Sequence, residues 1–287
     1  MSGGSHTPQH VFVGDIQGCA DEFDELLARL GDSFGDEFVL HSVGDLVNRG
    51  PDNLRVLERM RELVAAGRGH HVLGNHEIAL ISVILGIRTL GERDTIGDVL
   101  ESAEAPDWLE WLRGRPLVES GELPGQVYVT VHASVAPHWS AEDCVERGQA
   151  AAARLAGADL DDVRAFLAAP AAQAAADSER DALGRLVSCR SIRGEAWSSK
   201  EPLEADSEPW HRAWQRQAHD YGVVYGHWAR QGLYLAPGLR GLDTGCVHHG
   251  RGRDGHLTAW LPAGDRPFDV PEPTLWQVPA RRRYYPY

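Results

Sequence analysis

The stretch VFVGDIQGCADEF, residues 11–23, contains the first copy of a recurring sequence pattern that predicts the fold. A short apolar run ends at Gly14 and Asp15, and an amphipathic segment begins a few residues later. The same order recurs at FVLHSVGD (38–45) and HHVLGN (70–75), with helical patterns near 20–30 and 52–66 between the runs. This alternation predicts a βαβαβ unit with a mainly parallel sheet, whose functional residues gather in loops at the carboxyl ends of the strands.

The rest of the chain predicts two more helices and a second sheet. Helical patterns cover about 76–87 and 94–114, and a strand pattern follows at QVYVTVHA, 126–133. Further strand patterns lie at 222–228, 232–236, 239–245 and 255–261. We expect these later strands to form a second sheet packed on the first, which makes the chain an α/β protein.

The segment from about 138 to 218 differs from its surroundings. It is Ala-rich and helical up to about 187, then irregular and Trp-bearing through EPWHRAWQRQ. Because it separates two groups of strand patterns, it is expected to be a helical cap inserted into the main domain. The prediction is therefore a single domain over 1–287 with one insertion at about 138–218.

Composition limits the classes of function. The chain is 43% hydrophobic and 24% charged, as in an ordinary folded protein, and its net charge is -14. Such a charge argues against general nucleic-acid binding, although a local basic pocket could still hold a phosphate. Four scattered cysteines, no apolar leader pattern and no membrane-length apolar window predict a reduced, cytoplasmic protein without a membrane partner.

Polar side chains follow the predicted strands one after another. The first strand ends at Asp15 and Gln17, two residues apart and so on one side, and the next ends in GDLVNRGP, which supplies Asp45. Later strand ends add GNHE, VHA and GHW, and with them Asn75, His76, His132 and His227. A single Gly-Asp is more often a turn, and a single buried His is more often a core residue. The ordered set outweighs both explanations.

Oxygen and imidazole ligands without thiolate suit Mn²⁺, Fe, Co²⁺ or Zn²⁺ in a reactive site better than a structural zinc site. A two-metal site is the natural interpretation, because two cations bridged by one carboxylate can activate a water and offset charge on a transferring phosphoryl group. Asp45 is the candidate bridge. Arg49 lies in the turn that Pro51 rigidifies.

The blocks GDIQG, GDLVNRG and GNHE resemble the three signature motifs of the calcineurin-like metallophosphoesterases. Longer blocks, among them LGNHEIALISVILGI, WLRGRPLV, YGHWARQGLY and LDTGCVHHG, resemble the bacterial symmetrical bis(5'-nucleosyl)-tetraphosphatase subfamily over most of 11–140 and 220–260. The resemblance implies a two-sheet β-sandwich flanked by helices, with an inserted helical cap.

The same resemblance implies roles for the residues. The first divalent metal would be held by Asp15, Gln17 and Asp45, and the second by Asp45, Asn75, His132 and His227. Mn²⁺ is the metal we expect first, with Co²⁺, Fe²⁺, Zn²⁺ and Mg²⁺ as alternatives. His76 would protonate the leaving group, and Arg49 would bind phosphate.

Two positions depart from the broader family pattern. Gln17 replaces a His, which leaves the first metal a neutral and less basic amide ligand. Asn48 replaces the Asp that would orient His76, so this His is expected to be a weaker acid or to depend on another carboxylate. Because a nucleoside diphosphate leaves as a weakly basic anion, it needs less protonation than an alkoxide, and the second change fits a nucleotide-cleaving enzyme.

Residues near the expected cap could bind substrate. The stretch DALGRLVSCR resembles the family segment that carries a substrate-binding Arg in the cap, which makes Arg185 a candidate phosphate ligand, with Arg190 and Arg193 nearby. A solvated helix face is the alternative for all three. Trp197, Trp210 and Trp214 could stack on adenine, but packing is the favoured role.

Three further features lie near the carboxyl end of the chain. Asp243 could orient a ligand such as His227 through a hydrogen bond, or be an ordinary strand-end Asp. HHGRGRDGH, 248–256, is interpreted as a loop near the substrate, and no role is assigned to RRRYYPY at the end of the chain.

The resemblance implies symmetrical hydrolysis of diadenosine tetraphosphate to two ADP by a dinuclear metal-activated hydroxide. Other dinucleoside polyphosphates and Np4-type caps on RNA 5' ends are expected as secondary substrates. The alternative enzyme is a PPP-type serine/threonine protein phosphatase, which would need an open groove in place of a cap. A protein that senses such nucleotides without cleaving them is a third reading, which the full ligand set disfavours.

Overall fold

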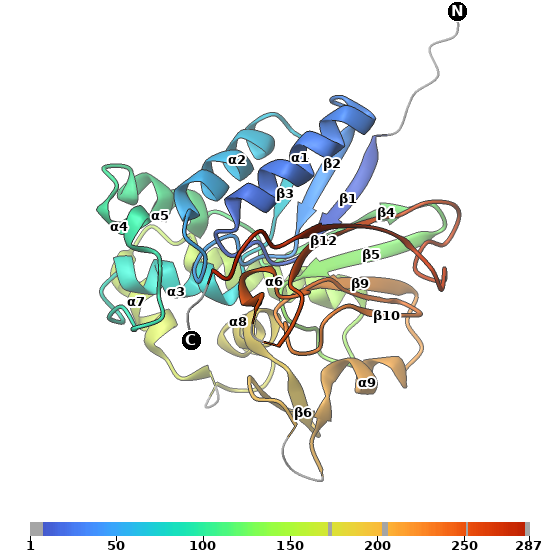
Figure 1. Cartoon of the computed structure of the whole chain (residues 1–287). Coiled ribbons are helices and arrows are strands. Elements are labelled where there is room, and N and C mark those ends of the chain that lie inside the picture. The colour runs from blue at the N-terminus through green and yellow to red at the C-terminus, as the bar shows by residue number, and fades with distance from the viewer. Residues whose placement is uncertain (1–7, 172–173, 203–205, 251, 285–287) are drawn as a thin grey trace, which may run out of the picture.

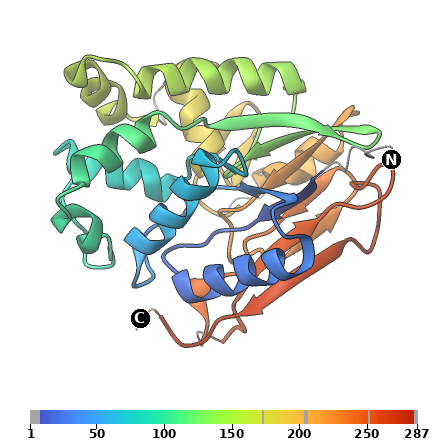
Figure 2. The ribbon, with the colours of Figure 1, turned by 90° about the horizontal axis from the view of Figure 1, so that it is seen from above.

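The computed structural model describes residues 8–171, 174–202, 206–250 and 252–284 (Figure 1). Two five-stranded sheets face each other, and helices cover their outer sides (Figures 1 and 2). The expectation of a two-sheet α/β architecture is therefore confirmed. Within the described residues, none of the helices combines the length and apolar character needed to cross a membrane.

The first sheet has the order β13-β12-β1-β2-β3. Its parallel strands are β1 (Gln9–Val13), β2 (Phe38–Ser42) and β3 (Gly69–His71), which match the three predicted strands. The crossovers run through α1 (Ala20–Phe34) and α2 (Asn53–Ala65). This is the expected βαβαβ unit, and its buried helix faces, from Phe23 to Leu30 and from Val56 to Leu63, hold it on the sheet.

The strand predicted at 255–261 was assigned to the wrong sheet. β12 (His256–Leu261) lies antiparallel to β1 in the first sheet, with β13 (Thr274–Pro279) on its other side. An apolar pattern identifies a strand but not its neighbour, and here Trp260 packs on Phe12 and Phe268 between the two sheets, 5.2 and 4.9 Å away by ring centroids.

The second sheet has the order β10-β11-β9-β5-β4. It consists of β4 (Val118–Leu123), β5 (Gln126–Val131), β9 (Tyr221–Tyr225), β10 (Tyr234–Ala236) and β11 (Leu239–Gly241). β5, β9 and β11 run parallel to one another, so the ends of β5 and β9 lie at one edge.

The helices that connect the first sheet to the second along the chain differ from the prediction in one place. α3 (Asn75–Ile84) follows β3 directly, as expected. The single helix predicted over 94–114 is instead α4 (Gly97–Glu101) and α5 (Ala105–Arg113). Ser102 leaves the helical conformation with a ψ of 141°, and Pro106 is the second residue of the next helix, in the first turn, where its missing N–H costs nothing.

The chain between β5 and β9 carries four helices and a small sheet among its described residues. These elements are α6 (Ala141–Leu155), α7 (Leu160–Ala168), α8 (Glu179–Ser188), β6 (Ser191–Arg193), β7 (Ala196–Ser198), β8 (Glu208–Pro209) and α9 (Trp210–Gln215). α6 contacts β4 and β5 and so covers the outer face of the second sheet (Figure 2). A separate cap over about 138–218 stays a prediction.

Candidate metal centre

The loops after β1, β2, β3, β5 and β9 meet at one edge of the two sheets and deliver the candidate residues. Several of them have a left-handed backbone: Gln17 (φ 50°), Asp45 (φ 53°), Asn48 (φ 77°), Arg49 (φ 71°) and His227 (φ 68°). L residues rarely adopt this conformation, and it costs free energy unless the surroundings impose it. Five such residues in three neighbouring loops mark this edge as a functional site.

Two glycines allow the backbone to approach the carboxylates. A Cβ on Gly74 would lie 2.2 Å from Oδ1 of Asp45, and a Cβ on Gly226 would lie 2.0 Å from Oδ1 of Asp15. No side chain could be accommodated at either distance. The glycines of the GNHE and GHW motifs are thus required by the two carboxylates that they adjoin.

Glu77 holds these loops together and was not predicted from the sequence. Its buried carboxylate accepts hydrogen bonds from four backbone N–H groups, those of Asp45 (2.9 Å), Leu46 (2.8 Å), Val47 (3.2 Å) and Gly74 (2.8 Å). It lies in the first turn of α3, beside the positive end of the helix dipole. An acidic residue next to the apolar run IALISVI was the one signal that could have revealed it.

His132 is oriented as a metal ligand. Its Nδ1 lies 3.0 Å from the backbone carbonyl of Val43, which can only accept, so Nδ1 carries the hydrogen. The lone pair on Nε2 then faces Oδ1 of Asn75 at 3.1 Å and Oδ1 of Asp45 at 3.4 Å. Lone pairs that converge in this way repel one another unless a cation lies among them.

His227 repeats this pattern from the other side. Its Nε2 lies 3.1 Å from the carbonyl of Ser188, which leaves the lone pair on Nδ1, 2.8 Å from Oδ1 of Asn75. In both rings a hydrogen bond from one nitrogen fixes the other as the ligand atom, as is usual for metal-binding histidines.

The candidate position for the first metal is built around Asp15. Possible ligand atoms of Asp15, Asp45 and His132 all lie within 4.8 Å of one another. Oδ1 of Asp15 accepts a hydrogen bond from the backbone N–H of His227 at 3.0 Å. The side chain of Gln17 is directed to the same place, with Nε2 3.4 Å from Oδ2 of Asp45.

The pKa shifts of the buried carboxylates and of His132 favour binding of a divalent cation at this cluster. Burial and the neighbouring charges of Asp243 and Asp45 raise the pKa of Asp15 well above its usual range. Burial likewise raises the pKa of Asp45 to about 7, and it raises that of Asp243. Burial also lowers the pKa of His132 to about 4 and so keeps its lone pair available. Buried carboxylates beside neutral imidazoles fit bound cations, which would offset the repulsion.

His76 lies at the edge of this cluster, with Nε2 3.7 Å from Oδ2 of Asp45. Burial, followed by the charge of Arg49, lowers the pKa of His76 well below its usual value. Its other nitrogen contacts Asn48 at 3.0 Å, and the Asn48 amide also contacts Asp94 at 2.8 Å. The sequence-based expectation that another carboxylate supports His76 thus has a candidate in Asp94.

Arg49 lies beside this group. Its Nη1 forms an ion pair with Asp94 at 3.1 Å and donates to the carbonyl of Arg93 at 2.6 Å. Arg49 does not line the pocket described next, so its predicted phosphate contact would require the guanidinium to move.

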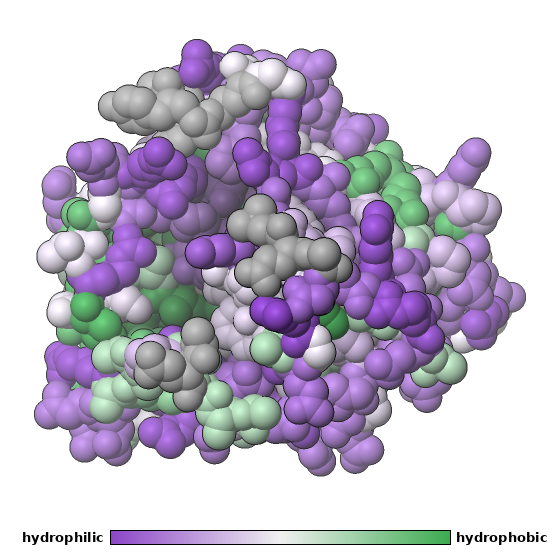
Figure 3. Space-filling model, turned by 90° about the horizontal axis from the view of Figure 1, so that it is seen from below, coloured by the Kyte–Doolittle hydropathy of each residue, from purple (hydrophilic) through white to green (hydrophobic). Residues whose placement is uncertain are grey.

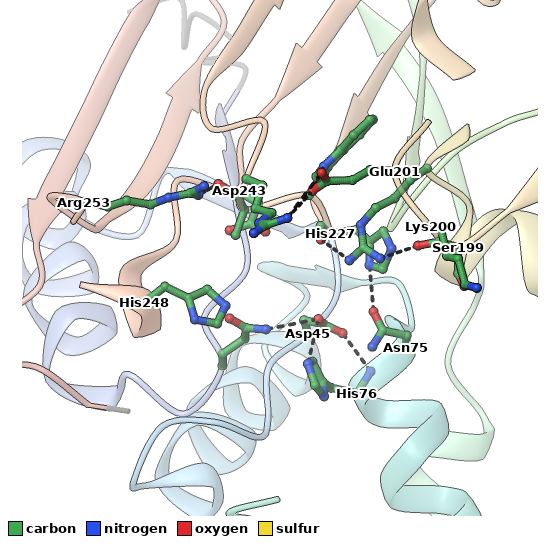
Figure 4. A pocket seen from close by; sticks show the side chains of 15 residues that line it. Asp45, Asn75, His76, Ser199, Lys200, Glu201, His227, Asp243, His248 and Arg253 are labelled. Atoms are coloured by element: carbon green, nitrogen blue, oxygen red, sulfur yellow. Dashed lines mark hydrogen bonds and ion pairs between the residues drawn. The ribbon is translucent and has the colours of Figure 1, made fainter. Parts of the chain in front are cut away.

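A pocket of about 740 Å³ opens over the cluster (Figure 4). Asp45, Asn75, His76 and His227 lie on one side of it, and Asp243, His248 and Arg253 lie on another (Figure 4). Its basic lining residues are Arg190, Lys200, Arg230, Arg253 and the histidines already named. Seen from below, the molecule presents a mostly hydrophilic face that is hollowed (Figure 3). The pocket can therefore hold a negatively charged ligand next to the metal ligands.

The three arginines that are candidate phosphate ligands lie in different environments in the structure. Arg190 lines the pocket and donates to the carbonyls of Ser199 at 2.6 Å and His227 at 3.2 Å. Arg185 does not line it: the side chain is buried and forms an ion pair with Asp181 at 2.7 Å. Arg193 is the exposed last residue of β6 and pairs with Asp206. None of the three arginines therefore lies on a solvated helix face.

The remaining candidates have clear positions. Asp243 lines the pocket and accepts a hydrogen bond from the backbone N–H of Gly245 at 3.0 Å. Trp210 and Trp214 are buried in the core, as the packing interpretation expected. Trp197 lines a second cavity of about 220 Å³ that shares Asn75 with the main pocket.

Two predicted segments are only partly described. In the loop 248–256, His248 and Arg253 line the pocket, whereas residue 251 lies outside the described residues. In the terminal segment, residues 285–287 lie outside them too, while Tyr284 donates a hydrogen bond to Glu22 at 2.6 Å. Lys200 and Glu201 also line the pocket, and no spacing or motif predicted them. Trp228 lines it too, next to His227 in the GHW motif.

Residues 10–153 match the family described as calcineurin-like phosphoesterase, and the chain belongs to that family. It is 35% identical over 278 residues to a Ralstonia nicotianae protein named bis(5'-nucleosyl)-tetraphosphatase, symmetrical, with 90% of this chain and 91% of that protein covered.

Two solved structures share the fold. One is described as a candidate diadenosine tetraphosphatase, with a TM-score of 0.62 at 23% identity, covering 96% of this chain and 95% of that one. The other is a protein serine/threonine phosphatase from Saccharomyces cerevisiae, with a TM-score of 0.53 at 14% identity, covering 90% of this chain and 74% of that one.

Proposed function

We propose that this protein hydrolyses diadenosine tetraphosphate symmetrically to two ADP with a dinuclear metal centre. Its relatives of about 35% identity over most of both chains are named bis(5'-nucleosyl)-tetraphosphatase, symmetrical, which supports this substrate class and cleavage pattern. The observation that carries the proposal is the convergence of ligand atoms from Asp15, Asp45 and His132 below a basic pocket. Other dinucleoside polyphosphates and Np4-capped RNA ends, which share the anhydride, are proposed as secondary substrates.

The residues fit two divalent cations. Asp15, Gln17 and Asp45 would hold one, and Asp45, Asn75, His132 and His227 the other, with Mn²⁺ as the proposed metal. Such cations would supply Lewis-acid chemistry, activating the attacking water and offsetting charge on the phosphoryl group.

The chain's own side chains would orient the polyphosphate. The guanidinium of Arg190 lies in the pocket and is held by two backbone carbonyls, so it offers charge in a fixed place. Lys200, Arg230 and Arg253 also line the pocket, where they can accommodate the remaining phosphates. Trp197, in the cavity that shares Asn75, offers an apolar face for a base.

The pocket walls favour this substrate over a phosphoprotein. Arg190, Ser199, Lys200 and Glu201 belong to the segment between β5 and β9, which a protein phosphatase would have to leave open as a groove. The likeness to the yeast phosphatase concerns the fold alone.

Product analysis tests the proposal directly. The Mn²⁺-loaded protein is incubated with diadenosine tetraphosphate, beside a His76→Ala variant, and the nucleotides are separated by ion-exchange chromatography. ADP as the sole product, lost in the variant, is the expected result. AMP with ATP would place the cleavage at an outer phosphate and refute symmetrical hydrolysis. Turnover of phosphopeptides alone would support the protein-phosphatase alternative.

A further inference from the structure

The amide of Asn48 has one orientation that satisfies its neighbours. Its Oδ1 accepts hydrogen bonds from the backbone N–H groups of Arg49 at 2.8 Å and Thr95 at 3.0 Å, both of which can only donate. Its Nδ2 lies 2.8 Å from Oδ1 of Asp94, an ionised carboxylate that can only accept. Burial opposes this ionised state, but hydrogen bonds from Asn48 and Gly91 and the charges of Arg88 and Arg49 hold the pKa of Asp94 at about 2.

This orientation determines which nitrogen of His76 carries hydrogen. One Nδ2 hydrogen of Asn48 is directed to Asp94, and the other points at Nδ1 of His76, 3.0 Å away. Nδ1 must therefore accept, and the hydrogen of the ring resides on Nε2. Nε2 in turn faces the metal centre, 3.7 Å from Oδ2 of Asp45.

We infer that Asp94 and Asn48 hold His76 as a hydrogen-bond donor at Nε2, and that this arrangement restricts the enzyme to phosphoanhydrides. The specificity part of the inference rests on the proposed function. An Asp at position 48 would do the opposite, because its carboxylate would accept a hydrogen from Nδ1. Asp94 is a positioning residue, since it acts on His76 through Asn48.

The chemistry of the two leaving groups explains the restriction. Hydrolysis forms a P–O bond from water and breaks the P–O bond to the leaving group, which departs with the electron pair. An ADP leaving group is a stable phosphate anion that needs only a hydrogen bond, and the protons of the water pass to solvent as the products ionise. An alkoxide or phenoxide leaving group must also take up a proton, which a ring that keeps its single hydrogen cannot deliver.

The test exchanges the two side chains. The double variant N48D/D94N keeps one carboxylate and one amide in the same pair of positions and reverses the direction of the hydrogen bonds. Protein labelled with ¹⁵N-histidine and loaded with diamagnetic Zn²⁺ is examined by NMR, and His76→Gln assigns the His76 signals. The wild type is expected to show hydrogen on Nε2 of His76, and the exchanged variant hydrogen on Nδ1. Hydrogen on Nδ1 in the wild type would overturn the inference.

Kinetics then test the specificity. The activity ratio of phenyl phosphate to diadenosine tetraphosphate is expected to rise about tenfold or more in the exchanged variant. A carboxylate at position 48 accepts the Nδ1 hydrogen, so Nε2 of His76 can take up a second proton and pass it to the departing phenoxide. An unchanged ratio with an exchanged tautomer would refute the restriction. Failure of the wild type to cleave diadenosine tetraphosphate would refute the proposed function. The tautomer of His76 is measured without substrate, so the NMR result tests the first part of the inference independently of that activity. The single variant N48D serves if the double variant does not fold.

Discussion

Arg190 donates a hydrogen bond from Nη2 to the backbone carbonyl of His227, 3.2 Å away, and so joins the wall of the pocket to the loop that carries a candidate metal ligand. The charges of Asp243, Asp45 and Asp15 lie close enough to influence the guanidinium, although burial is the larger effect and lowers the pKa of Arg190. A phosphate that enters the pocket would therefore meet the charged guanidinium of Arg190, which lies close to the carboxylates of the candidate metal centre.

Arg190→Ala is expected to reduce kcat/KM for diadenosine tetraphosphate about 100-fold or more, because a charge-assisted contact to the phosphoryl group is lost. Arg193→Ala is the matched control, since Arg193 belongs to the same segment but lies exposed at the end of β6, where it pairs with Asp206. Steady-state kinetics decide the matter. Equal losses in both variants would contradict the assignment of Arg190 to substrate.

Arg185→Ala should act on stability. Arg185 and Asp181 form an ion pair whose two side chains are each only 6% exposed, so removing the arginine leaves a carboxylate buried without its partner. Breaking such a pair costs about 3–5 kcal/mol. Urea unfolding of the metal-free protein measures the loss, and the double variant Arg185→Ala, Asp181→Ala should recover part of it. A variant with wild-type stability but weak substrate binding would return Arg185 to the list of phosphate ligands.

Glu77→Gln is expected to weaken both the fold and the metal site. An amide cannot accept at its NH₂ end, so two of the four backbone N–H groups lose their acceptor, at a cost of roughly 2–4 kcal/mol. Because Asp45 lies in one of the loops so held, Mn²⁺ affinity should fall too. Urea unfolding and Mn²⁺ titration measure the two effects, with the exposed Glu62→Gln as control. Unchanged Mn²⁺ affinity in a destabilised variant would show that Glu77 supports only the fold.

Most of the fold could be predicted where an apolar run ends in a polar motif. β1, β2, β3, β5 and β9 all have this form, and each was found within a few residues. β4 was missed because Val118–Leu123 is buried at its two ends and partly exposed between them, and its Glu119 and Gly121 disfavour a strand. Its hydrogen bonds to β5 form it nonetheless.

The candidate site was predictable for residues that directly follow a strand. His132 and His227 are such cases, because parallel strands bring their ends together wherever they lie in the sequence. Asp94 could not be found in this way: it lies in a loop before α4, and only the folded chain brings it to Asn48, 46 residues earlier. Lys200 and Glu201 reach the pocket through long-range packing that no local pattern encodes.

Gln17→His is expected to tighten the first metal position. An imidazole is a more basic ligand than an amide oxygen, and a gain of about tenfold in affinity corresponds to about 1.4 kcal/mol. Mn²⁺ binding is followed by electron paramagnetic resonance, which gives the affinities of the two metal positions separately. Gln17→Ala should instead lower the affinity of the first position, which is the weaker of the two. If neither variant changes Mn²⁺ binding, Gln17 is not a ligand.

His71→Phe is expected to make the protein less sensitive to acid. Neither ring nitrogen of His71 has a hydrogen-bond partner among the described residues, and the ring stacks on Trp111 with centroids 6.0 Å apart. Burial, then the charges of Arg115 and His132, lower its pKa to about 3 from an unfolded value of 6.5. The stability linked to the neutral ring is thus fully present above pH 6.5 and is lost as the pH falls toward 3, by roughly 1.4 kcal/mol per pH unit.

Replacing His71 removes this titration while the other buried histidines stay the same in both proteins, so the difference in free energy of unfolding isolates one group. His71→Phe keeps the stacked ring and removes two unpaired nitrogens, and it should be at least as stable as the wild type at pH 8. His71→Gln also removes the titration but buries an unpaired amide, which costs about 1–3 kcal/mol at every pH. Urea unfolding at pH 8, 6.5 and 5 measures all three proteins. A parallel fall in stability for wild type and His71→Phe below pH 6.5 would show that His71 does not contribute to acid sensitivity.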